Sequence, residues 1–206
     1  MNKYAITRDK FFSAQEKQGL LRVCRNRATA DLIKGRKNWI TRYMLIHLSL
    51  NTGLRVSEIA ALRVEDLHMN GKENYLIVQN GKGGKKRDVY MDKDLVKHLQ
   101  EYLEIREKEW GETIEGISPL FSGRGGRHYT TTAFWTSFKR AIESAGLPGT
   151  YSIHSARHTY ATFLLAKSNN LRFVQKQLGH ASIAMTSLYA DVLHPIPFFD
   201  WVQPHE

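Results

Sequence analysis

Cysteine, proline and long apolar runs are scarce in this chain of 206 residues, which holds one cysteine, Cys24, and five prolines. A single cysteine excludes an internal disulfide and a zinc site made of several cysteines. No apolar run approaches the ~20 residues of a membrane-spanning helix, and the N-terminus lacks the apolar stretch of a signal peptide. We therefore expect a soluble, cytoplasmic protein.

Acidic residues are also in the minority, because 30 Lys and Arg stand against 20 Asp and Glu and give a net charge of +10. Residues 1–37 hold ten basic and three acidic residues, and residues 80–89 hold four and one. These two segments account for the whole positive excess. Such a localised excess favours a polyanionic partner such as nucleic acid, although many basic proteins bind none.

The rest of the composition, 42% hydrophobic, is that of a globular chain long enough for one domain. Two strand-like runs, 75–78 and 87–91, flank a turn rich in glycine and lysine and predict a β-hairpin. Apolar residues at helical spacing predict helices elsewhere, and Ser13 and Glu16 have the spacing of a capping box. The first expected helix begins at Ser13, and further helices are expected over 39–50, 56–62, 93–109, 130–145, 154–166 and 171–178. Gly179 is the expected C-cap of the last of these, and a short helix carrying Tyr189 follows. This pattern predicts an α+β fold, mainly helical with a small antiparallel sheet.

Several residues have the types and spacing that attack on a phosphodiester requires. Arg55 and Arg157 supply planar guanidinium groups, which bind phosphate oxygens by paired hydrogen bonds and stay charged at any working pH. His154 lies one helical turn before Arg157, on the same helix face. His180 follows the Gly179 stop, where a loop could present its ring to the same centre. Taken singly, each residue is more often structural than catalytic, but one chemistry uses them all.

Tyr189 is the candidate nucleophile. A phenol has a pKa of about 10, so it needs a base or strong positive charge nearby to attack at neutral pH. The leaving deoxyribose oxygen needs a proton, and Lys82 in the predicted hairpin turn is the candidate acid.

Other chemistries have weaker support. The glycine-rich stretches 81–84 and 123–126 lack the ending of a phosphate-binding P-loop, and we interpret them as a hairpin turn and a basic loop. No carboxylate cluster indicates a two-metal nuclease. His154 and His158 have the spacing of zinc ligands but lack the accompanying glutamate motif and a third ligand. We therefore expect neither a metal nor a cofactor.

The same residues resemble the catalytic domain of the tyrosine recombinase family, also called the phage integrase family. The matching segments are 52–62 (TGLRVSEIAAL), 81–87 (GKGGKKR), 154–162 (HSARHTYAT) and 177–180 (QLGH) through Tyr189. The resemblance implies strand exchange through a covalent 3′-phosphotyrosine, without metal or ATP.

By the same resemblance, each motif position has a role. Arg55 and Arg157 would bind the scissile phosphate, and Lys82 would be the general acid. His154 and His180 would assist proton transfer, Tyr189 would attack, and Glu58 would support Arg55. The contacts to DNA that we expect are Lys85, Lys86, Arg127 and Thr131.

The resemblance covers residues 13–191, which we expect to form the catalytic domain, after a basic lead-in of 1–12 and before a proline and aromatic tail of 192–206. Family members usually carry a further helical domain that closes around DNA, whereas only a short basic segment precedes the match here. We therefore expect either an isolated catalytic domain or a minimal recombinase. Phosphate contacts would then dominate DNA affinity and make it strongly salt-dependent. We expect a tetramer on paired double-stranded DNA sites and a monomer or weak assembly without DNA.

The predicted function is site-specific recombination of DNA from a phage, another mobile element or a chromosome. The same chemistry could instead serve a type IB topoisomerase or a resolvase of hairpin telomeres. A DNA-binding accessory protein with an idle site is a different class, and an RNA-binding protein would explain the charge but leave the motifs unexplained.

Overall fold

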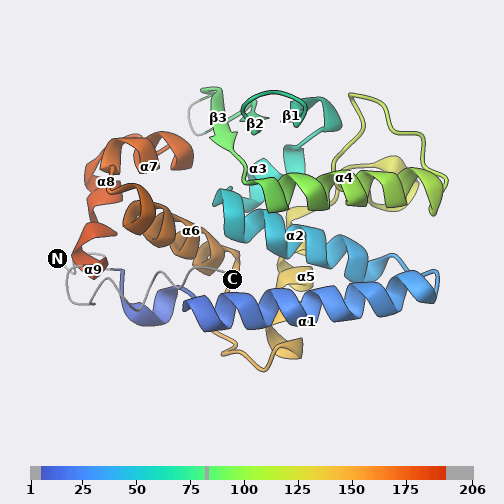
Figure 1. The fold of residues 1–206 in the computed structure, drawn as a ribbon, viewed down its shortest axis with the longest axis horizontal. Coiled ribbons are helices and arrows are strands. Elements are labelled where there is room, and N and C mark those ends of the chain that lie inside the picture. The colour runs from blue at the N-terminus through green and yellow to red at the C-terminus, as the bar shows by residue number, and fades with distance from the viewer. Residues whose placement is uncertain (1–5, 82–83, 194–206) are drawn as a thin grey trace.

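Helices dominate the computed structural model of the protein, which describes residues 6–81 and 84–193, with the backbone alone for Arg124, Asp191 and Leu193 (Figure 1). The α-helices are α1 Ala14–Ile33, α2 Asn38–Thr52, α3 Val56–Ala61, α4 Lys93–Lys108, α5 Thr131–Ser144, α6 Ile153–Ser168, α7 Leu171–Leu178, α8 Ala184–Ser187 and α9 Ala190–Leu193. Three short 3-10 turns are η1 Arg8–Lys10, η2 Val64–Asp66 and η3 Arg124–Gly126. The expected α+β class is thereby confirmed.

The sheet has three antiparallel strands in the order β1 Leu67–His68, β2 Tyr75–Val78 and β3 Arg87–Tyr90. Strands β2 and β3 form the predicted hairpin, in which Leu76 pairs with Val89. Strand β1 was not predicted, because two residues are too few to carry an alternating pattern. The predicted tip residue Lys82 and the tail from residue 194 lie outside the described residues.

Local sequence signals set the helix ends that position the site. The Ser13 hydroxyl accepts from the Glu16 N–H at 3.1 Å, and the Glu16 carboxylate accepts from the Ser13 N–H at 2.7 Å, so the capping box is confirmed. Gly53 ends α2 with φ +61° and Gly179 ends α7 with φ +63°. Both conformations favour glycine, which has no Cβ to clash.

The buried apolar side chains form two clusters. The larger one joins α1, α2, α4, α5 and the sheet, with Phe12 from the segment before α1. The smaller one lies among α6, α7 and the last turns of the chain, and includes Ile6, Phe11 and Tyr189. The segment before α1 therefore packs on both clusters.

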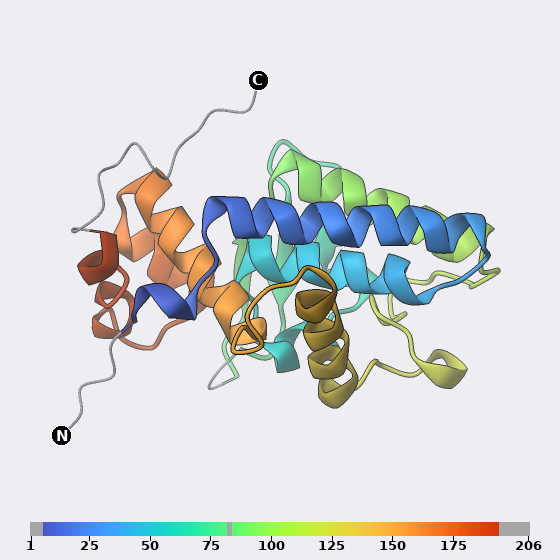
Figure 2. The same ribbon diagram turned by 90° about the horizontal axis from the view of Figure 1, so that it is seen from below.

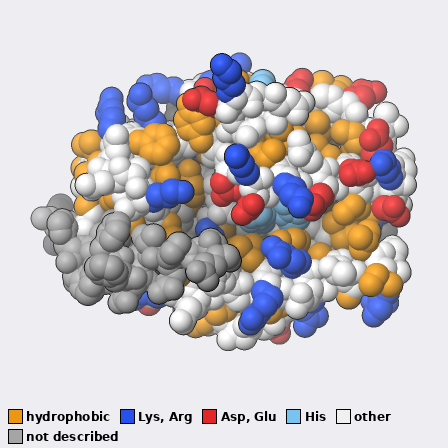
Figure 3. Space-filling view, in the orientation of Figure 1, with side chains coloured by type: hydrophobic (Ala, Val, Ile, Leu, Met, Phe, Trp, Pro, Cys, Tyr) orange, Lys and Arg blue, Asp and Glu red, His pale blue; other side chains and the backbone are white. Residues whose placement is uncertain are grey.

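A second view shows which elements share a side of the molecule. In Figure 2, α5, α3, the first turn of α6 and the strand ends beside residues 82–83 all reach the lower side. On the face seen in Figure 1, basic and acidic side chains are interspersed (Figure 3). No helix in the described part of the chain is long and apolar enough to cross a membrane.

Candidate active site

Arg157 is the buried centre of the site. It lies in the second turn of α6, is 7% exposed, and donates from Nη1 to the Gly53 carbonyl at 2.6 Å and from Nη2 to the Leu178 carbonyl at 2.8 Å. These carbonyls end α2 and α7, where the backbone lacks helical donors and carries partial negative charge. Burial, followed by the charge of Arg55, lowers the pKa of Arg157 to about 10, so the guanidinium is charged at neutral pH.

Arg55 directly precedes α3 and is held by Glu58 from within that helix. The Arg55 Nη1 atom lies 2.8 Å from Glu58 Oε1, and the Arg55 N–H donates to Oε2 at 2.8 Å. Burial alone would raise the pKa of Glu58, but hydrogen bonds from Arg87 and Arg55 outweigh it and hold that pKa below its ordinary value. Glu58 is therefore an anion that contacts both arginines.

Arg87 was not assigned to the site from the sequence. It donates to both Glu58 carboxylate oxygens at 2.9 Å and from Nε to the Gln177 carbonyl at 3.0 Å, and its side chain is only 11% exposed. The Gln177 side chain in turn accepts from the Tyr90 N–H at 2.9 Å. Arg87 thus joins the hairpin to α3 and α7. Arg87 closes the matching segment 81–87, but its place in a basic run is typical of a solvent-exposed side chain, so no role was assigned to it.

Tyr189 lies in the turn between α8 and α9, so the expectation that a helix carries it was wrong. Its side chain is 2% exposed within the smaller cluster, and its hydroxyl lies 3.0 Å from His158 Nδ1. Burial, followed by the charges of His154 and Arg157, lowers the pKa of His158 to about 4. A neutral imidazole therefore faces the phenol, and the tautomer decides which group donates.

The two predicted histidines differ in exposure. His154 is exposed in the first turn of α6, one turn before Arg157. His180 is half-buried beyond Gly179, stacks at 6.3 Å from the Tyr189 ring, and places Nδ1 3.0 Å from the Thr186 hydroxyl. Burial, followed by the charge of Arg157, lowers the pKa of His180 to about 4, so His180 is neutral at pH 7.

The structure brings most of the predicted catalytic side chains to one centre. Arg157 interacts electrostatically with Arg55 and Tyr189, and His180 with both arginines, although Arg55 and Tyr189 are far apart in sequence. The centre combines fixed positive charge with a phenol and neutral imidazoles, a set suited to an anionic phosphate under attack by an oxygen.

The predicted DNA contacts are all solvent-exposed. Lys85 and Lys86 precede β3, Arg127 follows η3, and Thr131 begins α5. Within the described ranges, no group of three or more His, Cys, Asp or Glu side chains is arranged to hold a metal ion.

Comparisons with known proteins fit this geometry. Residues 10–194 match the phage integrase family, and the chain therefore belongs to that family. The tyrosine recombinase XerD of Oceanobacillus iheyensis is 36% identical over 149 residues, which cover 72% of this chain and 49% of the relative. The chain thus spans about half the length of that relative.

Solved structures share the fold. The crystal structure of the XerA recombinase superposes with a TM-score of 0.71 at 26% identity, over 91% of this chain and 61% of that chain. The XerH site-specific recombinase, bound to its palindromic difH substrate after cleavage, gives a TM-score of 0.72 at 24% identity, over 88% of this chain and 49% of that chain. At that identity the likeness concerns the fold alone.

Proposed function

We propose that the protein is a site-specific DNA recombinase that cleaves and rejoins double-stranded DNA through Tyr189. The observation that carries the proposal is the convergence of Arg55, Arg157 and His180, from segments far apart in sequence, on one centre beside the Tyr189 ring. The family to which the chain belongs and the names of its relatives support the same function. The aligned region covers only about half of that relative, so the proposal concerns the activity of this catalytic portion.

In the proposed step, the phenolic oxygen of Tyr189 forms a bond to phosphorus while the bond from phosphorus to the 5′ oxygen breaks. Arg55 and Arg157 hold the non-bridging oxygens and stabilise the charge that develops there. The phenolic proton passes to a neutral imidazole, either His158 or His180, and Lys82 protonates the leaving 5′ oxygen. His154, exposed beside Arg157, assists at the phosphate.

Rejoining is the reverse step, with the 5′ hydroxyl of a partner strand as the nucleophile. Each cleaved phosphodiester is conserved as a phosphotyrosine ester, so the balance of bonds needs neither ATP nor a metal. Because Tyr189 is 2% exposed, its hydroxyl must turn outward from His158 to reach a phosphate. The proposal therefore includes a shift of the turn between α8 and α9 when DNA binds.

The test is a nicked suicide duplex bearing a site that the protein selects from a random pool, analysed on a denaturing gel. We expect a covalent protein–DNA band that Tyr189→Phe abolishes and that Tyr75→Phe, a control at a half-buried tyrosine of β2, retains. A band that persists in Tyr189→Phe would assign the nucleophile to another residue. No band on any selected site would favour a binding protein with an idle site.

The proposed partners are double-stranded DNA and further copies of this chain. Double-stranded DNA is the proposed substrate on the strength of the site and of relatives solved with DNA. A tetramer on paired sites, with a weak assembly otherwise, is proposed because two duplexes must each be cleaved for an exchange. Light scattering with and without the selected duplex measures it.

A further inference from the structure

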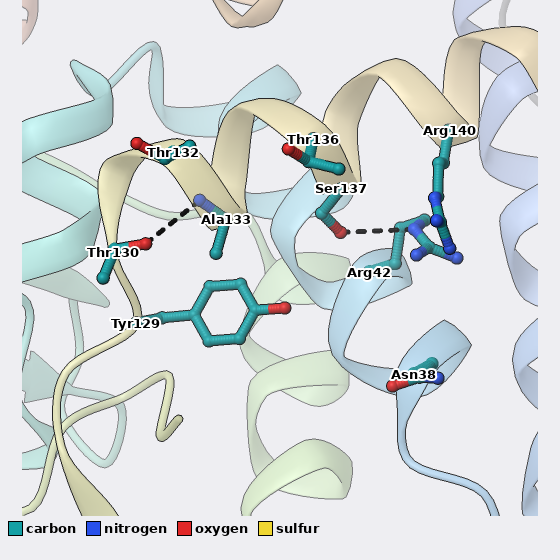
Figure 4. A pocket seen from close by; sticks show the side chains of 9 residues that line it. All are labelled: Asn38, Arg42, Tyr129, Thr130, Thr132, Ala133, Thr136, Ser137 and Arg140. Carbon is teal, nitrogen blue, oxygen red and sulfur yellow. Dashed lines mark hydrogen bonds between the residues drawn. The ribbon is translucent and has the colours of Figure 1, made fainter. Parts of the chain in front are cut away.

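A second cationic centre lies away from Tyr189, where the beginning of α5 meets the beginning of α2. It is a hollow of about 440 Å³, and polar side chains from both helices line most of it (Figure 4). The guanidinium groups of Arg42 and Arg140 lie side by side at one end, and Tyr129 points into the hollow. The active site described above uses none of these residues.

Arg42 is buried in an unusual way for an arginine. Its side chain is 8% exposed, its Nε atom donates to the Ser137 hydroxyl at 3.2 Å, and its guanidinium lies 4.2 Å from the Trp39 ring centroid. Among the residues that the structure describes, no hydrogen bond uses its Nη atoms, which leaves their donors for the hollow. A buried guanidinium with spare donors is a binding group for an anion.

Arg140 adds a second positive charge beside Arg42, and the Asp31 carboxylate acts on Arg42 only as a minor influence. Burial, followed by the charge of Arg140, lowers the pKa of Arg42, so the two cations are close enough to repel. Across the part of the chain that the structure describes, no carboxylate forms an ion pair with either arginine. Two adjacent like charges are unfavourable alone and become favourable once an anion lies between them.

The rim indicates which anion fits. Thr130, Thr132 and Thr136 line one side, and threonine hydroxyls are frequent donors to phosphate oxygens. The Thr130 hydroxyl also accepts from the Ala133 N–H at 3.1 Å. The hollow lies on α5, the helix on the same side of the molecule as α3 and the first turn of α6 (Figure 2). A duplex laid on Arg55 and Arg157 would extend along that side.

We propose that Arg42 and Arg140 bind a backbone phosphate of double-stranded DNA, away from the phosphate that Tyr189 attacks. This inference rests on the proposed function, because that function places a duplex on this side. The contact fixes the position of α5 on the duplex and reads no base, so it is independent of sequence.

The experiment measures binding of the whole protein to a labelled duplex of arbitrary sequence over a series of salt concentrations. For Arg140→Gln we expect roughly tenfold weaker binding at low salt and a slope of log affinity against log salt that is smaller by about 0.9. Lys97→Gln, an exposed lysine of α4 outside the hollow and outside both basic segments, is the control and should change both less. Equal behaviour of the two variants would overturn the inference.

Two further measurements separate the alternatives. Arg42→Gln should weaken binding to a similar extent, and its melting temperature reports whether this variant folds. If Arg42→Gln does not fold, the test rests on Arg140→Gln, because Arg140 is exposed. A contrary result would be that inorganic phosphate raises the melting temperature of the wild type and leaves that of Arg140→Gln unaltered, while both proteins bind DNA equally well. In that case the hollow binds a small anion and the inference is overturned.

The cleavage assay with the suicide duplex is scored separately from the binding assay. A missing covalent band with an altered salt slope refutes only the recombinase function, and a band with an unaltered slope refutes only this inference.

Discussion

His158 and Tyr189 form a hydrogen bond that none of the sequence motifs predicted. Because the bond lies in a largely buried cluster, its loss should be measurable in the free energy of unfolding. We expect a coupling of about 1 kcal/mol between His158→Ala and Tyr189→Phe in a double-mutant cycle followed by urea unfolding. Additive effects of the two changes would mean that the contact contributes nothing to stability.

Lys82 is the residue that we propose as the general acid. If it protonates the leaving oxygen, Lys82→Ala should slow cleavage roughly a hundredfold or more, the usual contribution of a general acid. A 5′ bridging sulfur leaves without a proton, so a substrate carrying it should largely restore the rate. The measurement is single-turnover cleavage of both substrates by Lys82→Ala and by Lys85→Ala. Rescue confined to the Lys85 variant would transfer the role of the acid to Lys85.

Elements are held together around the site by Arg87, whose bidentate pair with Glu58 links the hairpin to α3. Removing one partner of a buried ion pair leaves an uncompensated charge and typically costs about 3 kcal/mol. We expect Arg87→Gln to lose about that much free energy of unfolding by urea denaturation. Arg63→Gln removes the exposed pair with Glu65 and should lose less than about 1 kcal/mol. Similar losses in both variants would contradict the linking role of Arg87.

The elements also show what the sequence can and cannot predict. The hairpin, most helices, the Ser13 capping box and the Gly179 stop follow from neighbours along the chain, and all are confirmed. The role of Arg87 depends on a carboxylate 29 residues away, and the burial of Arg42 depends on Ser137, 95 residues away. The family motifs drew attention to Arg55, Arg157 and Tyr189, whereas the position of Tyr189 in a turn against His158 follows from packing that no local pattern encodes.

The whole molecule should be sensitive to acid because it buries neutral histidines. His47 and His98 place their Nδ1 atoms 2.8 Å apart between α2 and α4, with Lys17, Arg25 and the Tyr43 ring facing them. Burial, followed by the charge of Lys17, lowers the pKa of His47 to about 4, and burial, followed by the interaction with His47, lowers the pKa of His98 to about 3. In the unfolded chain these histidines titrate near 6.5, so acid favours the unfolded state.

Stability should therefore be complete above about pH 6.5 and fall as the pH drops towards about 4, by up to about 1.4 kcal/mol per pH unit for each proton bound. Urea unfolding at a series of pH values measures the slope. His98→Gln should flatten it, and His68→Gln, an exposed histidine, should leave it unchanged. A flat profile in the wild type would show that the pair does not remain neutral.

Phe11 and Phe12 are adjacent in sequence, yet one ring enters the smaller cluster with Tyr189 and the other enters the larger cluster. Both rings are fully buried. The two clusters are therefore anchored by neighbouring residues, with none between them. With an extra residue inserted between them, one ring or the other could occupy its place, but not both. The surroundings of Tyr189 therefore depend on the chain length at a point remote from it in sequence.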